Sequence, residues 1–123
     1  MKKALHVKTD GQILEIDLEP NSLDALQTAV GGLVQAIDLD EFTLWANEEG
    51  KILNLPHNPI GQALWVFNYG YTDYIVGDVV ITQGYDYTDV EGDNIGLTSG
   101  QIHRLRTFAS AISRFVEPRL EVL

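Results

Sequence analysis

The stretch IVGDVVIT, residues 75–82, decides how this chain can fold. Most of its side chains are β-branched and nearly all are apolar, with Asp78 as its charged member. Side chains of this kind favour extended backbone, and an apolar run without polar alternation is typical of a strand covered on both faces. We therefore expect residues 75–82 to form the central strand of a sheet.

Four further strands are predicted before this one. Residues 5–8 and 14–18 alternate apolar and polar side chains on either side of the Asp10-Gly11 turn, which indicates a half-buried hairpin. Apolar runs over 33–39 and 42–46 predict a second pair of strands. The sheet is therefore expected to contain about five strands and to be mainly antiparallel.

Two short helices are predicted between the strands. Asn21 or Ser22 can cap the first, in which Leu23, Leu26 and Val30 recur at helical spacing before Gly31 ends it. The second begins at the pair Asn58-Pro59, because asparagine is a good N-cap and proline lacks only an N–H that the first turn does not use. Its expected buried stripe is Ile60, Ala63, Leu64 and Phe67.

The longest predicted helix lies at the C-terminal end. Thr98-Ser99-Gly100-Gln101 fits a capping box, and Pro118 is expected to close the helix. Its apolar stripe is Ile102, Leu105, Phe108, Ala109, Ile112, Phe115 and Val116. We predict a single α+β domain over residues 1–123, with three helices on one face of the sheet and the C-terminal amphipathic helix packed on it.

The polar stretch NEEGKILNLPHNP, residues 47–59, is dense enough to suggest an active site. Its parts are better explained as chain reversals, because asparagine starts turns and glycine accepts positive φ. Residues 47–50 are expected to be a hairpin turn, after which Lys51 resumes extended chain. The paired acids Glu48 and Glu49 would then be solvated.

Composition limits the classes of partner. The chain has 123 residues and a formal net charge of −10, and residues 1–95 hold sixteen acids against four lysines, or −12. An acidic surface repels phosphate, so we expect no direct binding of nucleic acid, whereas a protein partner with a basic surface is allowed. There is no cysteine, signal peptide or membrane-spanning run, so a cytoplasmic location and no membrane contact are expected.

No preassembled chemistry is visible in the sequence. His6, His57 and His103 have no neighbour at metal-ligand spacing, and we expect them to be solvated or locally hydrogen-bonded. Asp89, Glu91 and Asp93 alternate like the first ligands of a calcium loop, but Asn94 and Gly100 stand where that loop needs glycine and glutamate. We expect no catalytic residue, no metal and no cofactor.

Aromatic residues among acids form the predicted binding face. Tyrosine brings a large contact area at low rotamer cost and is enriched in protein interfaces. The alternative is that several of these rings close the core of a small domain. The predicted face is Trp65, Tyr69, Tyr71, Tyr85 and Tyr87 with the acids Asp86, Asp89, Glu91 and Asp93.

An ordered set of short motifs resembles a known family. They are VGG at 30–32, NEEGK at 47–51, LPHN at 55–58, IVGDVV at 75–80 and LTSGQ at 97–101. Over roughly residues 3–106 this pattern is similar to domain-of-unknown-function family 3846 of bacteria and bacteriophages. The resemblance implies a small cytoplasmic protein of a phage, a plasmid or their host, and it implies no chemistry.

The expected function is that of an acidic accessory protein that binds a host protein and is not an enzyme. One alternative is a small-molecule or nucleotide-binding domain with an anion at the helix N-terminus beside Asn58. Another is a DNA mimic of the antirestriction type, which would need carboxylates at roughly phosphate spacing. An enzyme would need an acid, a base and a nucleophile brought together by the fold.

Overall fold

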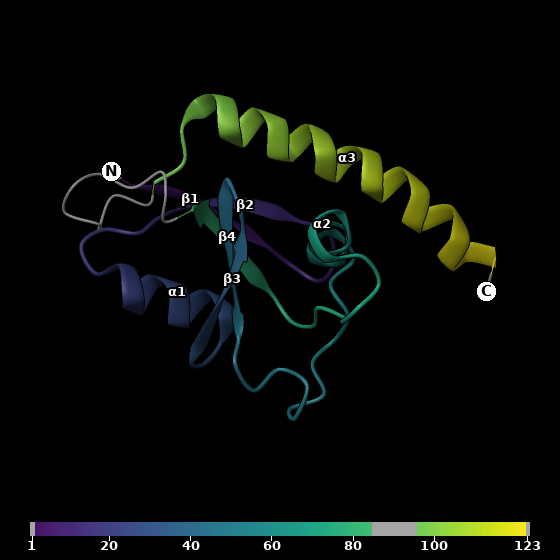
Figure 1. Cartoon of the computed structure of the whole chain (residues 1–123), viewed down its shortest axis with the longest axis horizontal. Coiled ribbons are helices and arrows are strands. Elements are labelled where there is room, and N and C mark those ends of the chain that lie inside the picture. The colour runs from purple at the N-terminus through teal and green to yellow at the C-terminus, as the bar shows by residue number, and fades with distance from the viewer. Residues whose placement is uncertain (1, 85–95, 123) are drawn as a thin grey trace.

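Strand β5 (Val79–Gln83) lies at the centre of a five-stranded antiparallel sheet (Figure 1). The computed structural model describes residues 2–84 and 96–122, with backbone alone beyond Arg114. Within these ranges the strand order is β2-β1-β5-β4-β3. The other strands are β1 (Lys3–Val7), β2 (Ile13–Asp17), β3 (Val34–Leu39) and β4 (Phe42–Asn47). The predicted α+β class and the central strand are confirmed.

The central strand begins later than predicted, at Val79, because the chain turns at Gly77. Gly77 has a φ of +79° and donates its N–H to the carbonyl of Pro56 over 2.7 Å. A Cβ at this position would lie 2.8 Å from Leu55 Cδ1. Residue 77 therefore needs glycine for its backbone conformation and for its close approach to Leu55.

Helices cover both faces of the sheet, whereas the sequence predicted helices on one face only. Helix α1 (Ser22–Val30) packs on the face that carries Ala4 and Val80, and α2 (Pro59–Tyr69) and α3 (Ser99–Val122) pack on the face that carries Leu5 and Ile81. Figure 1 shows α3 above the sheet and α1 below it. The central strands are apolar on both faces, so each face needs a cover.

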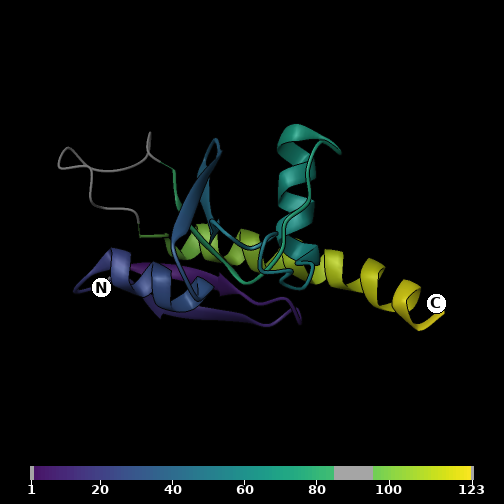
Figure 2. The same cartoon turned by 90° about the horizontal axis from the view of Figure 1, so that it is seen from below.

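The sheet is strongly twisted, as right-handed strands require. Figure 2 shows the β3–β4 hairpin turned away from the direction of β1 and β2, with α2 lying across α3. The hairpin and α2 therefore stand on the same side of the molecule. Residues 48–58 connect the hairpin to α2, and the candidate site lies beside this segment.

The predicted helix caps are confirmed. The side chain of Asn21 accepts the N–H of Asp24 at 3.1 Å, and Gly31 ends α1 with a φ of +79°. In α3 the Thr98 N–H donates to Gln101 Oε1 at 2.9 Å, and the Gln101 N–H donates to Thr98 Oγ1 at 3.1 Å. Each pair satisfies backbone groups that have no partner inside the helix.

Three local predictions were wrong. The backbone of residues 50–55 is paired within consecutive turns, so no extended chain follows Gly50. Phe67 is 76% exposed instead of buried. Helix α3 continues past Pro118 to Val122, although proline removes one backbone hydrogen bond. Side chains Phe115 and Val116 of the predicted stripe lie outside the described residues.

A buried asparagine joins three parts of the fold. Asn58 has no exposed surface; its Nδ2 donates to the carbonyls of Val7 (3.1 Å) and Gly77 (2.9 Å), and its Oδ1 accepts the Gly61 N–H at 3.0 Å. The side chain thereby connects the end of β1, the turn before β5 and the first turn of α2. We call this set of contacts the Asn58 clasp.

Replacing Asn58 by alanine should lower the free energy of unfolding by about 3 kcal/mol or more, because three buried backbone groups lose their partner. Urea denaturation measures the loss. Asn58→Asp keeps an acceptor for the Gly61 N–H but removes both donors, so we expect it to be at least as destabilised. If Asn58→Asp were as stable as the wild type, the cap alone would account for the role of Asn58.

Candidate functional site

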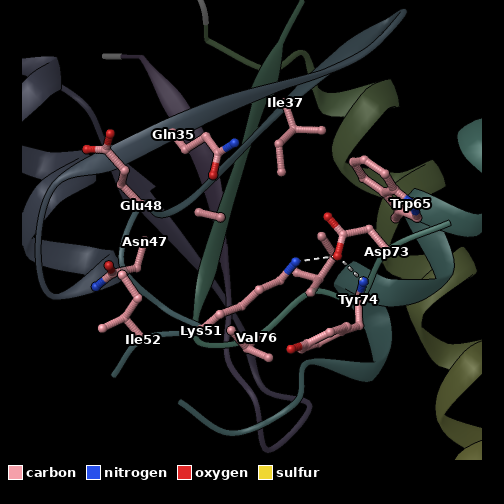
Figure 3. Close-up of a pocket in the computed structure, with 12 residues that line it drawn as sticks. Gln35, Ile37, Asn47, Glu48, Lys51, Ile52, Trp65, Asp73, Tyr74 and Val76 are labelled. Carbon is pink, nitrogen blue, oxygen red and sulfur yellow. Dashed lines mark hydrogen bonds and ion pairs between the residues drawn. The ribbon is translucent and has the colours of Figure 1, made fainter. Parts of the chain in front are cut away.

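A hollow of about 190 Å³ opens on the surface between the β3–β4 hairpin and the segment that follows α2 (Figure 3). We call it the Lys51 hollow, because the side chain of Lys51 extends across it. The hairpin supplies one wall, the turns after β4 the base, and residues 73–76 the other wall. Its lining residues are Gln35, Ile37, Ala46, Asn47, Glu48, Lys51, Ile52, Trp65, Asp73, Tyr74, Ile75 and Val76.

An ion pair crosses the hollow. Lys51 Nζ pairs with Asp73 Oδ1 and lies 4.4 Å from the centre of the Tyr74 ring, which adds a cation–π contact. The Lys51 side chain, followed by the backbone N–H of Tyr74 at 2.8 Å, holds the pKa of the Asp73 carboxyl below its ordinary value. Asp73 therefore stays ionised to lower pH than a free aspartate.

Side chains of α2 hold the far wall in place. Gln62 Oε1 accepts the N–H of Ile75 at 2.9 Å, and Gln62 Nε2 donates to the carbonyl of Asp73 at 3.0 Å. Trp65 Nε1 donates to Thr72 Oγ1 at 3.1 Å. His57 Nε2 lies 3.3 Å from the same Gln62 oxygen. The wall is thus fixed by tertiary hydrogen bonds as well as by its own turns.

Of the predicted aromatic face, the described part of the chain contains the rings of Trp65, Tyr69 and Tyr71. Trp65 is partly buried and packs against the core, and its ring centre lies 4.5 Å from that of Tyr69. Tyr69 donates its hydroxyl to the carbonyl of Asp38, while Tyr71 is 92% exposed. The structure thus brings Trp65 and Tyr69 together. Tyr85, Asp86, Tyr87, Asp89, Glu91 and Asp93 lie outside the described residues.

The alternative that these tyrosines close the core does not hold for Tyr69, Tyr71 and Tyr74, which are all exposed. Tyr71 and Tyr74 lie with Asp73 around a second, shallow depression that also contains His57 and Gln62. The face predicted from the sequence did not include Tyr74, Lys51 or Asp73, all of which line the hollow. Glu48 was predicted in a hairpin turn and Lys51 in extended chain after it; both lie in turns, and both line the hollow.

Asn58 offers little to an anion at the start of α2. Its side chain is wholly buried and each of its polar atoms is used in the Asn58 clasp. The carbonyl of Asn58 accepts the N–H of Gln62 at 2.8 Å. The arrangement identifies Asn58 as a structural residue.

The histidines divide into one paired and two exposed side chains. His6 Nε2 lies 2.9 Å from Asp78 Oδ2, and Asp78 Oδ1 accepts the N–H of Thr9 at 3.1 Å. Sequence reasoning missed this pair because 72 residues separate its members. His57 and His103 are exposed. Across the described side chains, residues 2–84 and 96–114, no cluster of three or more histidine or acidic residues could hold a metal ion.

A second polar network fixes α3 to the turn between β3 and β4. Arg104 donates to both carboxylate oxygens of Glu41, with Nη1 at 3.0 Å from Oε1, and Gln101 Nε2 donates to Oε2 at 3.1 Å. The Arg104 hydrogen bond is the main reason that the pKa of Glu41 lies below its ordinary value, and the Gln101 hydrogen bond adds to it. This network supports the hairpin that forms one wall of the hollow.

The network predicts a pH dependence of stability. Because the folded pKa of Glu41 lies below the value of about 4.3 of an unperturbed glutamate, its contribution is present above that pH. It is lost as the pH falls through the folded pKa. Glu41→Gln should lower the melting temperature by a few degrees at pH 7, and the difference from the wild type should close below about pH 4.

Glu49→Gln is the matched control, because Glu49 is exposed and its carboxylate has no ion pair within the described residues. It should leave the melting temperature unchanged at both pH values. A deficit of Glu41→Gln that persisted at low pH would show that the charge of Glu41 is not what stabilises the hairpin.

Fold and site together define a class: an α+β protein with an antiparallel sheet between helices and a polar hollow at one side. No helix of the described part of the chain is both long and apolar enough to cross a membrane. The chain belongs to the family described as domain of unknown function 3846, whose sequence profile matches residues 1–109. Neither the curated proteins nor the solved structures gave a significant match.

The match confirms the family resemblance and covers the whole sheet, α1, α2 and the first part of α3. It includes both walls of the Lys51 hollow and the Glu41–Arg104 contact. The hollow is therefore built by the part of the chain that defines the family.

Proposed function

We propose that this protein is a small acidic accessory protein of a phage or mobile element and acts by binding a host protein with a basic surface. We place the contact face around the Lys51 hollow. The observation that carries this proposal is a group of exposed apolar and aromatic side chains in and beside the hollow. Ile52 (82% exposed) and Tyr74 (55%) line it, and Tyr71 (92%) lines the adjoining shallow depression together with Tyr74.

Acids lie among these side chains. Glu48 and Glu49 are exposed on the turn beside Ile52, and neither carboxylate has an ion pair within the described residues. Interfaces commonly combine an aromatic or aliphatic centre with a charged rim, and complementary charge speeds association. The rim charges, together with the net charge of −10, favour a partner of positive charge.

The other functions have weaker support. The Lys51 hollow, at about 190 Å³, is smaller than the roughly 300–1,000 Å³ of usual small-molecule sites and is crossed by a lysine, so this hollow is disfavoured as such a site. A DNA mimic needs free carboxylates, whereas Glu41 and Asp73 are neutralised by Arg104 and Lys51. The phage or mobile-element origin is supported by the family resemblance and by the small acidic chain.

The contact face can be tested with two exposed side chains. Ile52→Ser should weaken binding of a partner isolated from host lysate at least tenfold, because an exposed aliphatic anchor is lost while the core is untouched. Leu23→Ser is the matched control, since Leu23 is 54% exposed on α1, on the opposite side of the sheet. Titration of the purified pair by calorimetry gives both affinities.

Both variants should keep the wild-type melting temperature. If Leu23→Ser weakened binding as much as Ile52→Ser, or if neither did, the face around the Lys51 hollow would not be the contact surface.

A further inference from the structure

The outer edge of β3 is open for hydrogen bonding in the part of the chain that the structure describes. There, β3 is the last strand of the sheet and pairs with β4 alone. Its register places Leu39 opposite Phe42, and the Glu48 N–H donates to the Leu33 carbonyl at 2.8 Å. Odd-numbered residues of β3 therefore bond to β4, and the backbone groups of Val34, Ala36 and Asp38 point outward.

Among the described residues, a side chain covers the C-terminal end of this edge and none is hydrogen-bonded to the rest. Tyr69 donates its hydroxyl to the outward carbonyl of Asp38. Gln35 and Ala36 are exposed, and Leu33, just before the strand, is 56% exposed. Proteins usually protect such an edge with lysine, proline, a bulge or a covering element. The segment from Val34 to Ile37 contains neither lysine nor proline.

The opposite edge of the sheet is protected. On β2, the side chain of Glu15 lies 3.6 Å from Lys3 Nζ and 3.8 Å from Arg106 Nη2. Arg106 Nη1 also lies 3.4 Å from the outward carbonyl of Ile13. Charged side chains, including Arg106 of α3, thus protect the outer edge of β2. The sheet therefore has one protected edge, at β2, and one open edge, at β3, which borders the Lys51 hollow.

Side chains of β3 connect this edge to the hollow. Gln35 and Ile37 point to the face on which the hollow lies, and Figure 3 shows them with Glu48 along one side of it. Alternate side chains of a strand added beside β3 would point to the same face. Lysine or arginine at these positions would come near Glu48, which has no ion pair within the described ranges.

We propose that β3 accepts an extended segment of a partner protein as an added strand, with lysine or arginine at alternate positions beside Glu48 and the Lys51 hollow. This inference rests on the proposed function and names its partner as a basic, extended polypeptide. Main-chain hydrogen bonds to Val34 and Ala36 supply affinity, and the acids beside the hollow, such as Glu48, select basic side chains on the added strand. A second copy of this chain is disfavoured because it also carries a net charge of −10.

The test uses a synthetic peptide of about nine residues, a full strand in length, in which lysine alternates with valine or threonine. Titrated into the isotopically labelled full chain, it should shift the amide signals of Val34 and Ala36 in a saturable way. Replacing its lysines by glutamate should abolish the shifts. Glu48→Gln should weaken binding of the lysine peptide several-fold.

Two substitutions at one position isolate the main-chain contact. Ala36→Pro removes the outward N–H and should weaken binding at least tenfold, since proline is tolerated on an edge but cannot pair. Ala36→Val keeps the N–H and favours extended backbone, so it should bind as the wild type does. Unchanged signals for β4 and α2 in Ala36→Pro verify that the fold is intact.

The peptide titration would overturn the inference with any of three results: no saturable shift up to millimolar peptide, shifts confined to β2, or equal affinity of Ala36→Pro and Ala36→Val. A dimer in sedimentation that Ala36→Pro abolishes would assign the edge to a second copy and also overturn it. Partner binding that depends on Ile52 but not on Ala36 would leave the proposed contact face standing. If peptide binding depended on Ala36 but Ile52→Ser had no effect on partner binding, the proposed contact face would be refuted and the β3 inference would stand.

Discussion

The Asn58 clasp is the contact on which the remaining structure depends. One buried amide side chain satisfies the carbonyls of Val7 and Gly77 and the N–H of Gly61, and so fixes three elements that are distant in the sequence. Buried polar groups of the backbone cost free energy when they lack a partner. The start of α2 and the turn before β5 are therefore fixed relative to each other. A side chain longer than asparagine at residue 58 could not reach the same three groups at the same distances.

From that position the geometry of the hollow follows. Helix α2 directs Gln62 and Trp65 toward the segment after its own end, and their hydrogen bonds hold Thr72, Asp73 and Ile75. Asp73 is thereby held opposite Lys51, which the turns after β4 supply. The ion pair is a consequence of the fold and contributes little to it, because both side chains are partly exposed and such pairs are weak. What the pair does provide is a polar surface of defined shape.

Features with a local cause could be predicted from the sequence, and features with a tertiary cause could not. The caps at Asn58 and Thr98 each depend on a few neighbouring residues, and the central strand on its own composition. Helical spacing alone did not place Phe67, because the neighbouring helix and sheet decide which side of α2 is buried. The pairs His6–Asp78 and Lys51–Asp73 join segments 72 and 22 residues apart, so no local pattern announces them.

The unequal edges of the sheet fit an acidic chain. A sheet edge without lysine or proline invites pairing with any other edge, including that of a second copy. Here the body of the chain is so acidic that copies repel one another, and this repulsion can take the place of a charged residue on the strand. The repulsion does not act on a basic segment, which it would instead attract. We therefore expect an open edge beside Glu48 to discriminate by charge, which would let a small acidic domain keep such a strand exposed without aggregating through it.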